Sequence, residues 1–213
     1  MRVLDGVRVL DLGVLVQAPQ AAATLSDLGA EVIKIELPGI GDMSRVIPVS
    51  PPDDVRSAFF TASNRGKRSV TLDLRTEAGA TAFRRLADNC DVVISNFKPG
   101  TMDDWGLGYD VLAETNPRLI WAAGSAFGHL GPDAEIEGAD LAGQARGGLI
   151  STTGADGGDM TPAGVTIADH VASQNLANGI MAALIARGRT GRGQKVEVSL
   201  LGGQLFAQAA EYT

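Results

Sequence analysis

Cysteine and histidine are scarce in this 213-residue sequence, and their scarcity excludes several kinds of site. The single cysteine, Cys90, leaves no second thiol for an intrachain disulfide or for a cysteine-rich zinc site. The two histidines, His129 and His170, have no further ligands at the spacing of a metal site and no GxSxG partner of the serine-hydrolase kind. We therefore expect no bound metal and a protein of the reducing cytoplasm.

Positive charge and long apolar runs are also lacking. The chain has 18 Lys and Arg against 25 Asp and Glu, a formal net charge of −7 and a pI of about 4.8, which disfavours a nucleic-acid-binding surface. No segment reaches ~18 uninterrupted apolar residues, and charges interrupt the first 13 positions. The sequence thus predicts neither a membrane span nor a signal peptide, whereas 45% hydrophobic and 20% charged residues are typical of a globular protein.

Strand-like and helix-like segments alternate along the chain. Residues 7–12 are β-rich, residues 18–30 are rich in Ala and Leu, and residues 31–36 are β-rich again, which predicts a parallel strand–helix–strand unit. The other expected strands lie at 69–74, 91–95, 118–124 and 194–200, and the other expected helices at 77–89, 109–115, 170–187 and from 200 onwards. We therefore expect an α/β fold with a Rossmann-like, doubly wound, mainly parallel sheet. The irregular segment 128–165 is long enough to contribute to a functional site.

Phosphate-binding signals are present but weak. The glycine-rich turn GxGxxG is missing after the first strand, where the sequence reads DLGVLVQAP, and this disfavours a dinucleotide site. Three cations in NRGKRS, at 64–69, precede the expected strand at 69–74, and Arg75 follows it. SNFKPG at 95–100 also follows a strand, and basic residues at strand ends lie on the ligand side of a doubly wound sheet. By pattern alone, a solvated loop explains such clusters more often than a phosphate site does.

One acidic residue is a candidate nucleophile. Asp169, in GVTIADHV, lies between a β-like stretch and a helix, where an aspartate typically caps the helix N-terminus. A cap at the positive end of a helix would keep the carboxylate ionised. A fixed, ionised carboxylate can attack an activated acyl group, so this position is a candidate catalytic site.

Several long motifs in the same order resemble one known family. They are GVRVLDLGVLVQAPQAAATLSDLGAEVIKIELPGIGD, NRGKRSVTLDLRTEAG, SNFKPGTMDDWGLGYDVLAETNPRLIW and RTGRGQKVEVSLL. Together they are similar to the class III coenzyme A (CoA) transferases, a family that includes formyl-, crotonobetainyl- and succinyl-CoA transferases and the 2-methylacyl-CoA racemases. The resemblance is collinear over nearly the whole chain.

The resemblance implies an architecture larger than this chain. Residues 1–213 would be the CoA-binding large domain of an interlocked homodimer, and the small domain and the returning C-terminal segment would be absent. The chain would then be a fragment, or one half of a split system with a C-terminal partner chain.

The resemblance also implies the site residues. Asp169 would be the transferase nucleophile. The family's CoA contacts fall on Val16, Gln17, Leu72, Asp73, Leu74, Arg75, Asn96, Phe97, Lys98, Glu137, Gly138, Ala139 and Asp140. Arg75 and Lys98 would meet phosphates, whereas two usual cations are replaced by Leu37 and Asp104. CoA and acyl-CoA would be substrates, with no permanently bound cofactor.

The implied reaction transfers CoA from an acyl-CoA donor to a carboxylic acid through an aspartyl anhydride and an aspartyl-CoA thioester. Racemases of the family instead use a His/Asp pair, with the His directly before the aspartate of the motif that reads GADLAGQA here. That position is Ala139, which favours a transferase. A third possibility is a catalytically silent, CoA-binding assembly subunit.

Overall fold

The computed structural model describes residues 2–47 and 57–212. The strands are β1 (Arg8–Asp11), β2 (Glu31–Glu36), β3 (Arg68–Thr71), β4 (Val92–Ser95), β5 (Ile120–Ser125) and β6 (Lys195–Ser199). The helices are α1 (Gln17–Asp27), α2 (Ala58–Asn64), α3 (Glu77–Ala87), α4 (Thr101–Asp104), α5 (Tyr109–Thr115), α6 (Asp140–Arg146), α7 (Leu149–Thr152), α8 (Ile167–Thr190) and α9 (Leu200–Ala207), with a 3-10 turn η1 (Met43–Val46).

All the strands belong to one parallel sheet, as the alternating pattern predicts. The six strands lie in the order β3-β2-β1-β4-β5-β6, and every neighbouring pair is parallel. The chain runs outwards from β1 in one direction and then, from β4 onwards, in the other. The carboxyl ends of β1 and β4 therefore meet at the point where the strand order reverses, the usual place for a ligand in a doubly wound sheet.

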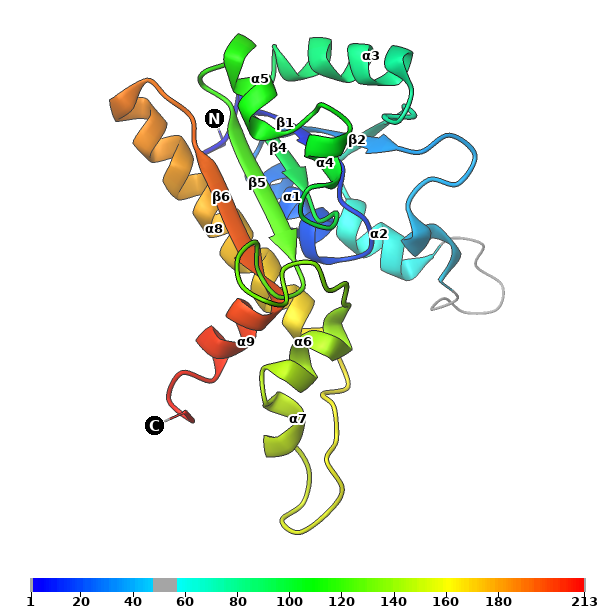
Figure 1. Cartoon of the computed structure of the whole chain (residues 1–213), viewed down its shortest axis with the longest axis vertical. Coiled ribbons are helices and arrows are strands. Elements are labelled where there is room, and N and C mark those ends of the chain that lie inside the picture. The colour runs from blue at the N-terminus through cyan, green and yellow to red at the C-terminus, as the bar shows by residue number, and fades with distance from the viewer. Residues whose placement is uncertain (1, 48–56, 213) are drawn as a thin grey trace.

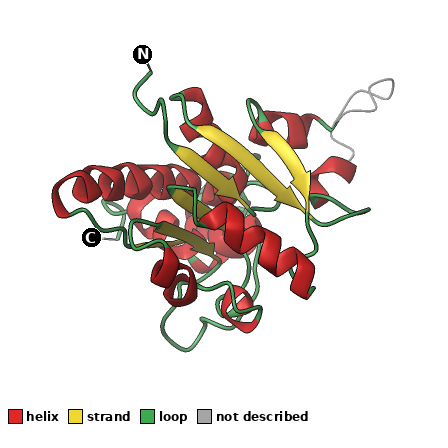
Figure 2. Ribbon diagram, turned by 90° about the horizontal axis from the view of Figure 1, so that it is seen from above, coloured by secondary structure: helices red, strands yellow, loops and turns green. Residues whose placement is uncertain are grey.

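Helices cover both faces of the sheet and form two separate cores (Figures 1 and 2). On one face, α1 and α8 pack on alternate strand residues such as Val9 and Ile94. On the other face, Leu10 and Val93 pack with Phe83 of α3 and with residues around α4 and α5. This alternation follows from the period of two in a strand, and burial on both faces explains the nearly continuous apolar strands.

Most expected elements are confirmed, with shifted bounds. Gly29 follows α1 with φ +111°, a backbone conformation that ends the helix and that side chains with a Cβ rarely adopt. Cys90 is buried in the same core as Phe83. The expected strand at 69–74 was too long, because a turn from Asp73 leads to Thr76, which caps α3. The helices α2, α4, α6 and α7 and the turn η1 were not predicted.

The segment 140–165 and α9 project from the body of the molecule (Figure 1). They expose the large apolar side chains Leu141, Met160, Val165, Leu205 and Phe206, and Tyr212 after α9 is also exposed. Phe206 is 70% exposed and Met160 is 72% exposed. Exposed apolar patches of this kind are typical of interaction sites. In the described part of the chain, no helix is both long and apolar enough to span a membrane.

Candidate active site

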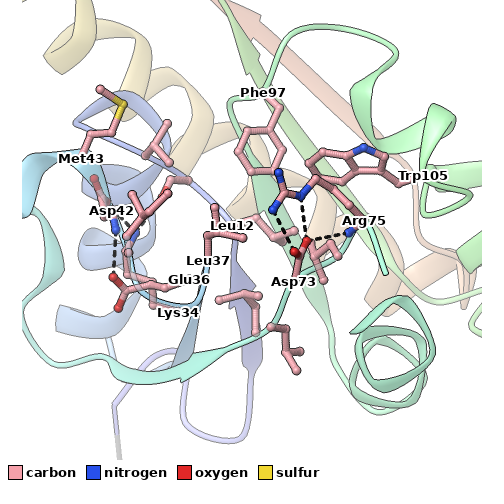
Figure 3. Close-up of a pocket in the computed structure, with 17 residues that line it drawn as sticks. Leu12, Lys34, Glu36, Leu37, Asp42, Met43, Asp73, Arg75, Phe97 and Trp105 are labelled. Carbon is pink, nitrogen blue, oxygen red and sulfur yellow. Dashed lines mark hydrogen bonds and ion pairs between the residues drawn. The ribbon is translucent and has the colours of Figure 1, made fainter. Parts of the chain in front are cut away.

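Two hollows lie at the carboxyl ends of the strands, on either side of the loop that joins β1 to α1. The first, called the Leu72 hollow, has a volume of about 320 Å³ and is lined mainly by apolar side chains between β2, residues 72–75 and Phe97 (Figure 3). The second, called the Asp169 hollow, has a volume of about 220 Å³ and is lined by residues around Gln17, Lys98, Gly138 and Asp169. Val14 and Phe97 line both hollows, which are therefore neighbours.

Asp169 does not cap a helix, contrary to the expectation. Helix α8 begins at Ile167 after Thr166, so Asp169 is its third residue. The free N–H groups of this helix end are taken by Asp140, whose Oδ1 accepts hydrogen bonds from Ala168 N at 2.7 Å and from Asp169 N at 3.1 Å. The spacing of GVTIADHV could not show this, because the capping carboxylate comes from α6, nearly 30 residues earlier in the chain.

The Asp169 carboxyl is consequently harder to ionise than an ordinary aspartate. Burial, followed by the negative charge of Asp140, raises its pKa from 3.8 to about 7. The sequence-based argument predicted the opposite direction. A carboxyl whose pKa lies near neutral pH and which lines a hollow is typical of a functional site.

Gln17 is the first residue of α1, and its side chain reaches the carboxyl end of β5. Its Nε2 donates a hydrogen bond to the carbonyl oxygen of Ser125 at 3.1 Å. The side chain lies directly over Gly124, where an added Cβ would come within 2.3 Å of Gln17 Oε1. Glycine at position 124 therefore makes room for Gln17, which lines the Asp169 hollow.

Asn96 uses its side chain to hold the β1–α1 loop. Its Oδ1 accepts a hydrogen bond from Val14 N and its Nδ2 donates one to Val14 O, each at 2.9 Å. Both ends of the amide are occupied in this way, so its side chain already has two partners before any ligand binds. Asn96 still lines the Asp169 hollow with Phe97 and Lys98.

Comparison with known proteins decides the family. The chain matches CoA-transferase family III over residues 4–213. It belongs to this family. A succinyl-CoA–D-citramalate CoA-transferase of Chloroflexus aurantiacus is 40% identical over 204 residues, which are 96% of this chain and 50% of that protein. The probable fatty acyl-CoA transferase Rv3272 of Mycobacterium tuberculosis is 42% identical over 201 residues, 92% of this chain and 50% of that protein.

Solved structures of similar proteins have the same fold. The orthorhombic crystal structure of Rv3272 superposes with a TM-score of 0.92 at 39% identity, covering 100% of this chain and 58% of that one. A CAIB/BAIF family protein of Brucella suis also gives 0.92, at 41% identity, covering 99% and 57%. The chain therefore spans about half the length of the curated relatives it matches.

The positions carried over from CoA-transferase family III divide between the two hollows. Leu72, Asp73, Leu74, Arg75 and Phe97 line the Leu72 hollow. Gln17, Asn96, Phe97, Lys98, Glu137, Gly138, Ala139 and Asp169 line the Asp169 hollow. Val16 is buried and lines neither hollow, and Asp140 lies behind Asp169 as the cap of α8.

The cations at the rim are already paired within the chain. Arg75 forms hydrogen bonds of 2.8 Å with both carboxylate oxygens of Asp73, as Figure 3 shows beside Phe97, and Lys98 Nζ lies 2.9 Å from Glu135. All these side chains are solvent-accessible, so an incoming phosphate can compete for the cations. Leu37 does line the Leu72 hollow, without the cation that the family usually has there.

The three cations of the basic run NRGKRS are paired with carboxylates, and one of them is not solvated. Lys67 is buried, and its Nζ lies 2.7 Å from Asp11 Oδ2. Arg65 pairs with Asp27 and Arg68 pairs with Glu31 at the surface. Across residues 2–47 and 57–212, no three potential ligands among His, Cys, Asp and Glu are grouped as a metal site would require.

Sequence reasoning missed a group of buried charges under the Leu72 hollow. Lys34 and Asp42 are each 1% exposed, and Lys34 Nζ lies 2.9 Å from Asp42 Oδ2 and 3.7 Å from Asp11 Oδ2. The signal was a lysine in the middle of the apolar strand EVIKIE, since a lysine in a strand covered on both faces needs a buried partner.

Proposed function

We propose that the protein to which this chain belongs transfers CoA from an acyl-CoA donor to a carboxylic acid acceptor, with Asp169 as the nucleophile. The observation that carries this proposal is the Asp169 carboxyl, which lines a hollow at the carboxyl ends of the strands and has a pKa of about 7. Near neutral pH a substantial fraction of this carboxyl is ionised, yet burial leaves it poorly solvated. A poorly solvated carboxylate is a better nucleophile than one surrounded by water.

Transfer proceeds by exchange of acyl groups on this carboxylate. A carboxylate oxygen of Asp169 attacks the carbonyl carbon of the donor thioester, the C–S bond breaks, and CoA leaves as a thiolate. The thiolate attacks the aspartyl carbonyl of the mixed anhydride, releasing the donor carboxylate and forming an aspartyl-CoA thioester. The acceptor carboxylate then displaces the thiolate to form a second anhydride. The thiolate attacks the acceptor carbonyl, which yields the new acyl-CoA and frees Asp169. Protons, electrons and groups balance, so the cycle needs no oxidant, reductant or external proton donor.

The arrangement of the hollows supports CoA as the carrier. The Leu72 hollow offers an apolar surface of nucleobase size, and Arg75 lies at its rim. The Asp169 hollow adjoins it, with Lys98 and Gln17 near the candidate nucleophile. A long ligand whose base occupies the first hollow and whose thioester enters the second would place its phosphates near the two cations, where charge-assisted hydrogen bonds are strongest.

The alternatives have less support. A two-base racemase needs an acid–base side chain beside Asp140, and Ala139 provides only a methyl group there. A silent CoA-binding subunit would not need a carboxyl with a shifted pKa in the hollow, because an aspartate in that role gains nothing from burial.

The remaining parts of the proposal concern the whole protein. We propose that the complete protein is a homodimer, or pairs with a second chain, and that it works in the cytoplasm. The exposed side chains of α6 and α9 support a covering partner. Relatives named succinate–glutarate CoA-transferase and formyl-CoA:oxalate CoA-transferase support carboxylic acids as acceptors.

Trapping of the covalent intermediate tests the proposed function. The complete protein is incubated with an acyl-CoA and hydroxylamine, and we expect a hydroxamate that mass spectrometry maps to Asp169. Asp169→Asn keeps the shape of the side chain but removes the nucleophile, so it should give neither the hydroxamate nor transfer. Trapping at another residue, or full turnover by Asp169→Asn, contradicts the proposal. Binding of CoA without any trapping or transfer supports the silent-subunit alternative instead.

A further inference from the structure

The β1–α1 loop, residues 12–16, has an unusual backbone. Leu15 has φ +64°, and within the described residues it is the only non-glycine with a left-handed φ. A leucine residue disfavours this conformation, because its Cβ comes too close to the following carbonyl oxygen. Contacts from the rest of the chain must therefore impose it. A role in the candidate site would explain why this backbone conformation is kept, since Val14 lines both hollows and Leu15 lines the Asp169 hollow.

Side chains from three other segments hold three consecutive residues of this loop. Lys34 Nζ donates a hydrogen bond to Gly13 O at 2.7 Å. Asn96 bonds both backbone groups of Val14. Asp42 Oδ1 accepts a hydrogen bond from Leu15 N at 3.0 Å. The strained Leu15 is thus held through its N–H group, Val14 through both its N–H and its carbonyl group, and Gly13 through its carbonyl oxygen.

Two of the side chains that hold the loop are buried and charged, and a contribution to stability does not by itself explain their presence. Lys34 and Asp42 are almost fully buried and lie 2.9 Å apart. Buried ion pairs contribute little net stability compared with apolar residues of similar size, because both ions lose their hydration. What the pair supplies here is a strong acceptor aimed at Leu15 N and a strong donor aimed at Gly13 O. Asp42 Oδ1 also accepts hydrogen bonds from the backbone and side chain of Ser44, which fixes the carboxylate itself.

We propose that Lys34 and Asp42 are positioning residues, which hold the β1–α1 loop as the partition between the Leu72 hollow and the Asp169 hollow. In this arrangement Val14 lines both hollows, and α1 begins with Gln17, which lines the same hollow as the candidate nucleophile. The functional importance of the partition rests on the proposed function, because a CoA thioester would have to pass along it. The holding contacts themselves can be tested without any ligand.

A matched pair of substitutions at Asp42 separates position from charge. Asp42→Ala and Asp42→Asn both remove the negative partner of Lys34, but only Asp42→Asn keeps an oxygen that can accept the hydrogen bond from Leu15 N. We expect Asp42→Ala to weaken CoA binding by about tenfold or more in calorimetry, and Asp42→Asn by less than about threefold. Lys34→Met removes the contact to Gly13 O and should also weaken CoA binding by about tenfold. This variant tests the proposal even where Asp42→Ala does not fold.

Lys67→Met is the control for general destabilisation. Lys67 belongs to the same buried charge group, but its Nζ contacts Asp11, Pro19 and Asn64 and does not contact the loop. This variant should lower the melting temperature and leave CoA affinity within about threefold of the wild type. An equal loss of affinity in Lys67→Met, or unchanged affinity in both Asp42→Ala and Lys34→Met, overturns the proposal.

Amide hydrogen exchange distinguishes failure of this inference from failure of the proposed function. In the absence of CoA, the peptide covering residues 13–17 should exchange at least roughly fivefold faster in Asp42→Ala than in the wild type, Asp42→Asn or Lys67→Met. If the wild type binds no CoA, the proposed function fails, and the exchange rates still decide whether Asp42 holds the loop. Equal exchange in Asp42→Ala and the wild type refutes the positioning role.

Discussion

Replacing Asp169 by asparagine should stabilise the protein at alkaline pH even though it removes the proposed nucleophile. The folded-state pKa of Asp169 is raised from 3.8 to about 7 by burial and by Asp140, so the folded state resists its ionisation. A group with a raised pKa contributes stability below its unfolded pKa and loses that contribution as the pH rises through its folded pKa. The wild type should therefore lose stability between about pH 4 and pH 7, and Asp169→Asn should not.

The magnitude follows from the size of the pKa change. A rise from 3.8 to about 7 corresponds to about 4 kcal/mol at ~1.4 kcal/mol per unit. Because the carboxyl is only partly buried in the described chain, solvent reduces this figure, and we expect about 2–4 kcal/mol at pH 8. Each kcal/mol raises the melting temperature by roughly 2–4 °C in a chain of this length.

Urea unfolding of wild type and Asp169→Asn at pH 5 and pH 8 measures the effect. The advantage of the variant should grow by about 1–3 kcal/mol between these two pH values. Asp110→Asn is the matched control, since Asp110 is an exposed aspartate in the first turn of α5 and should give no such growth. A constant difference between pH 5 and pH 8, or destabilisation of Asp169→Asn at pH 8, would refute the electrostatic reasoning about this site.

Three further predictions concern other parts of the chain. Burial opposes ionisation of Glu36, but hydrogen bonds from Arg45, Ser69 and Asp42 N outweigh it and lower its pKa from 4.5 to about 2. Glu36→Gln should therefore cost about 1–2 kcal/mol at pH 7, after allowance for solvent, and the difference from the wild type should vanish in unfolding curves as the pH falls from 4.5 to 2. Arg75→Ala should weaken CoA binding about tenfold in calorimetry, and unchanged affinity would remove Arg75 from the site. The 213-residue chain should self-associate in sedimentation experiments through its exposed apolar side chains, whereas a stable, monodisperse monomer would contradict this.

The fold was predictable because its signals are local. The alternation of β-rich segments with segments rich in Ala and Leu identified the strands and most of the longer helices. The short elements escaped prediction, since a helix of four residues such as α4 has too few positions to show a period. The bounds of β3 depended on a turn that Thr76 makes with Asp73, a contact that strand propensity does not encode.

Residues selected by the resemblance line one hollow, but sequence reasoning predicted the wrong direction for the pKa of Asp169. The resemblance selected Asp169, and the structure puts it in a hollow with Gln17 and Lys98. Its local sequence predicted a helix cap with a readily ionised carboxylate. The actual cap, Asp140, reaches α8 from another helix, and only the three-dimensional arrangement brings the two carboxyls together. Charge interactions across such sequence distances have no local pattern.

The β1–α1 loop has a consequence for how this architecture can change during evolution. In dinucleotide-binding folds with the same strand order, glycines leave the corresponding turn bare, so that the backbone itself meets a diphosphate. Here Val14 and Leu15 put side chains in that place, and Lys34 and Asp42 lie beneath them. Evolution from one kind of ligand site to the other by single substitutions would have to pass through proteins in which one of these two buried charges has lost its partner. Each such intermediate would have a lowered free energy of unfolding, because an unpaired buried charge is strongly destabilising. This loss of stability separates the two kinds of site despite their common strand order.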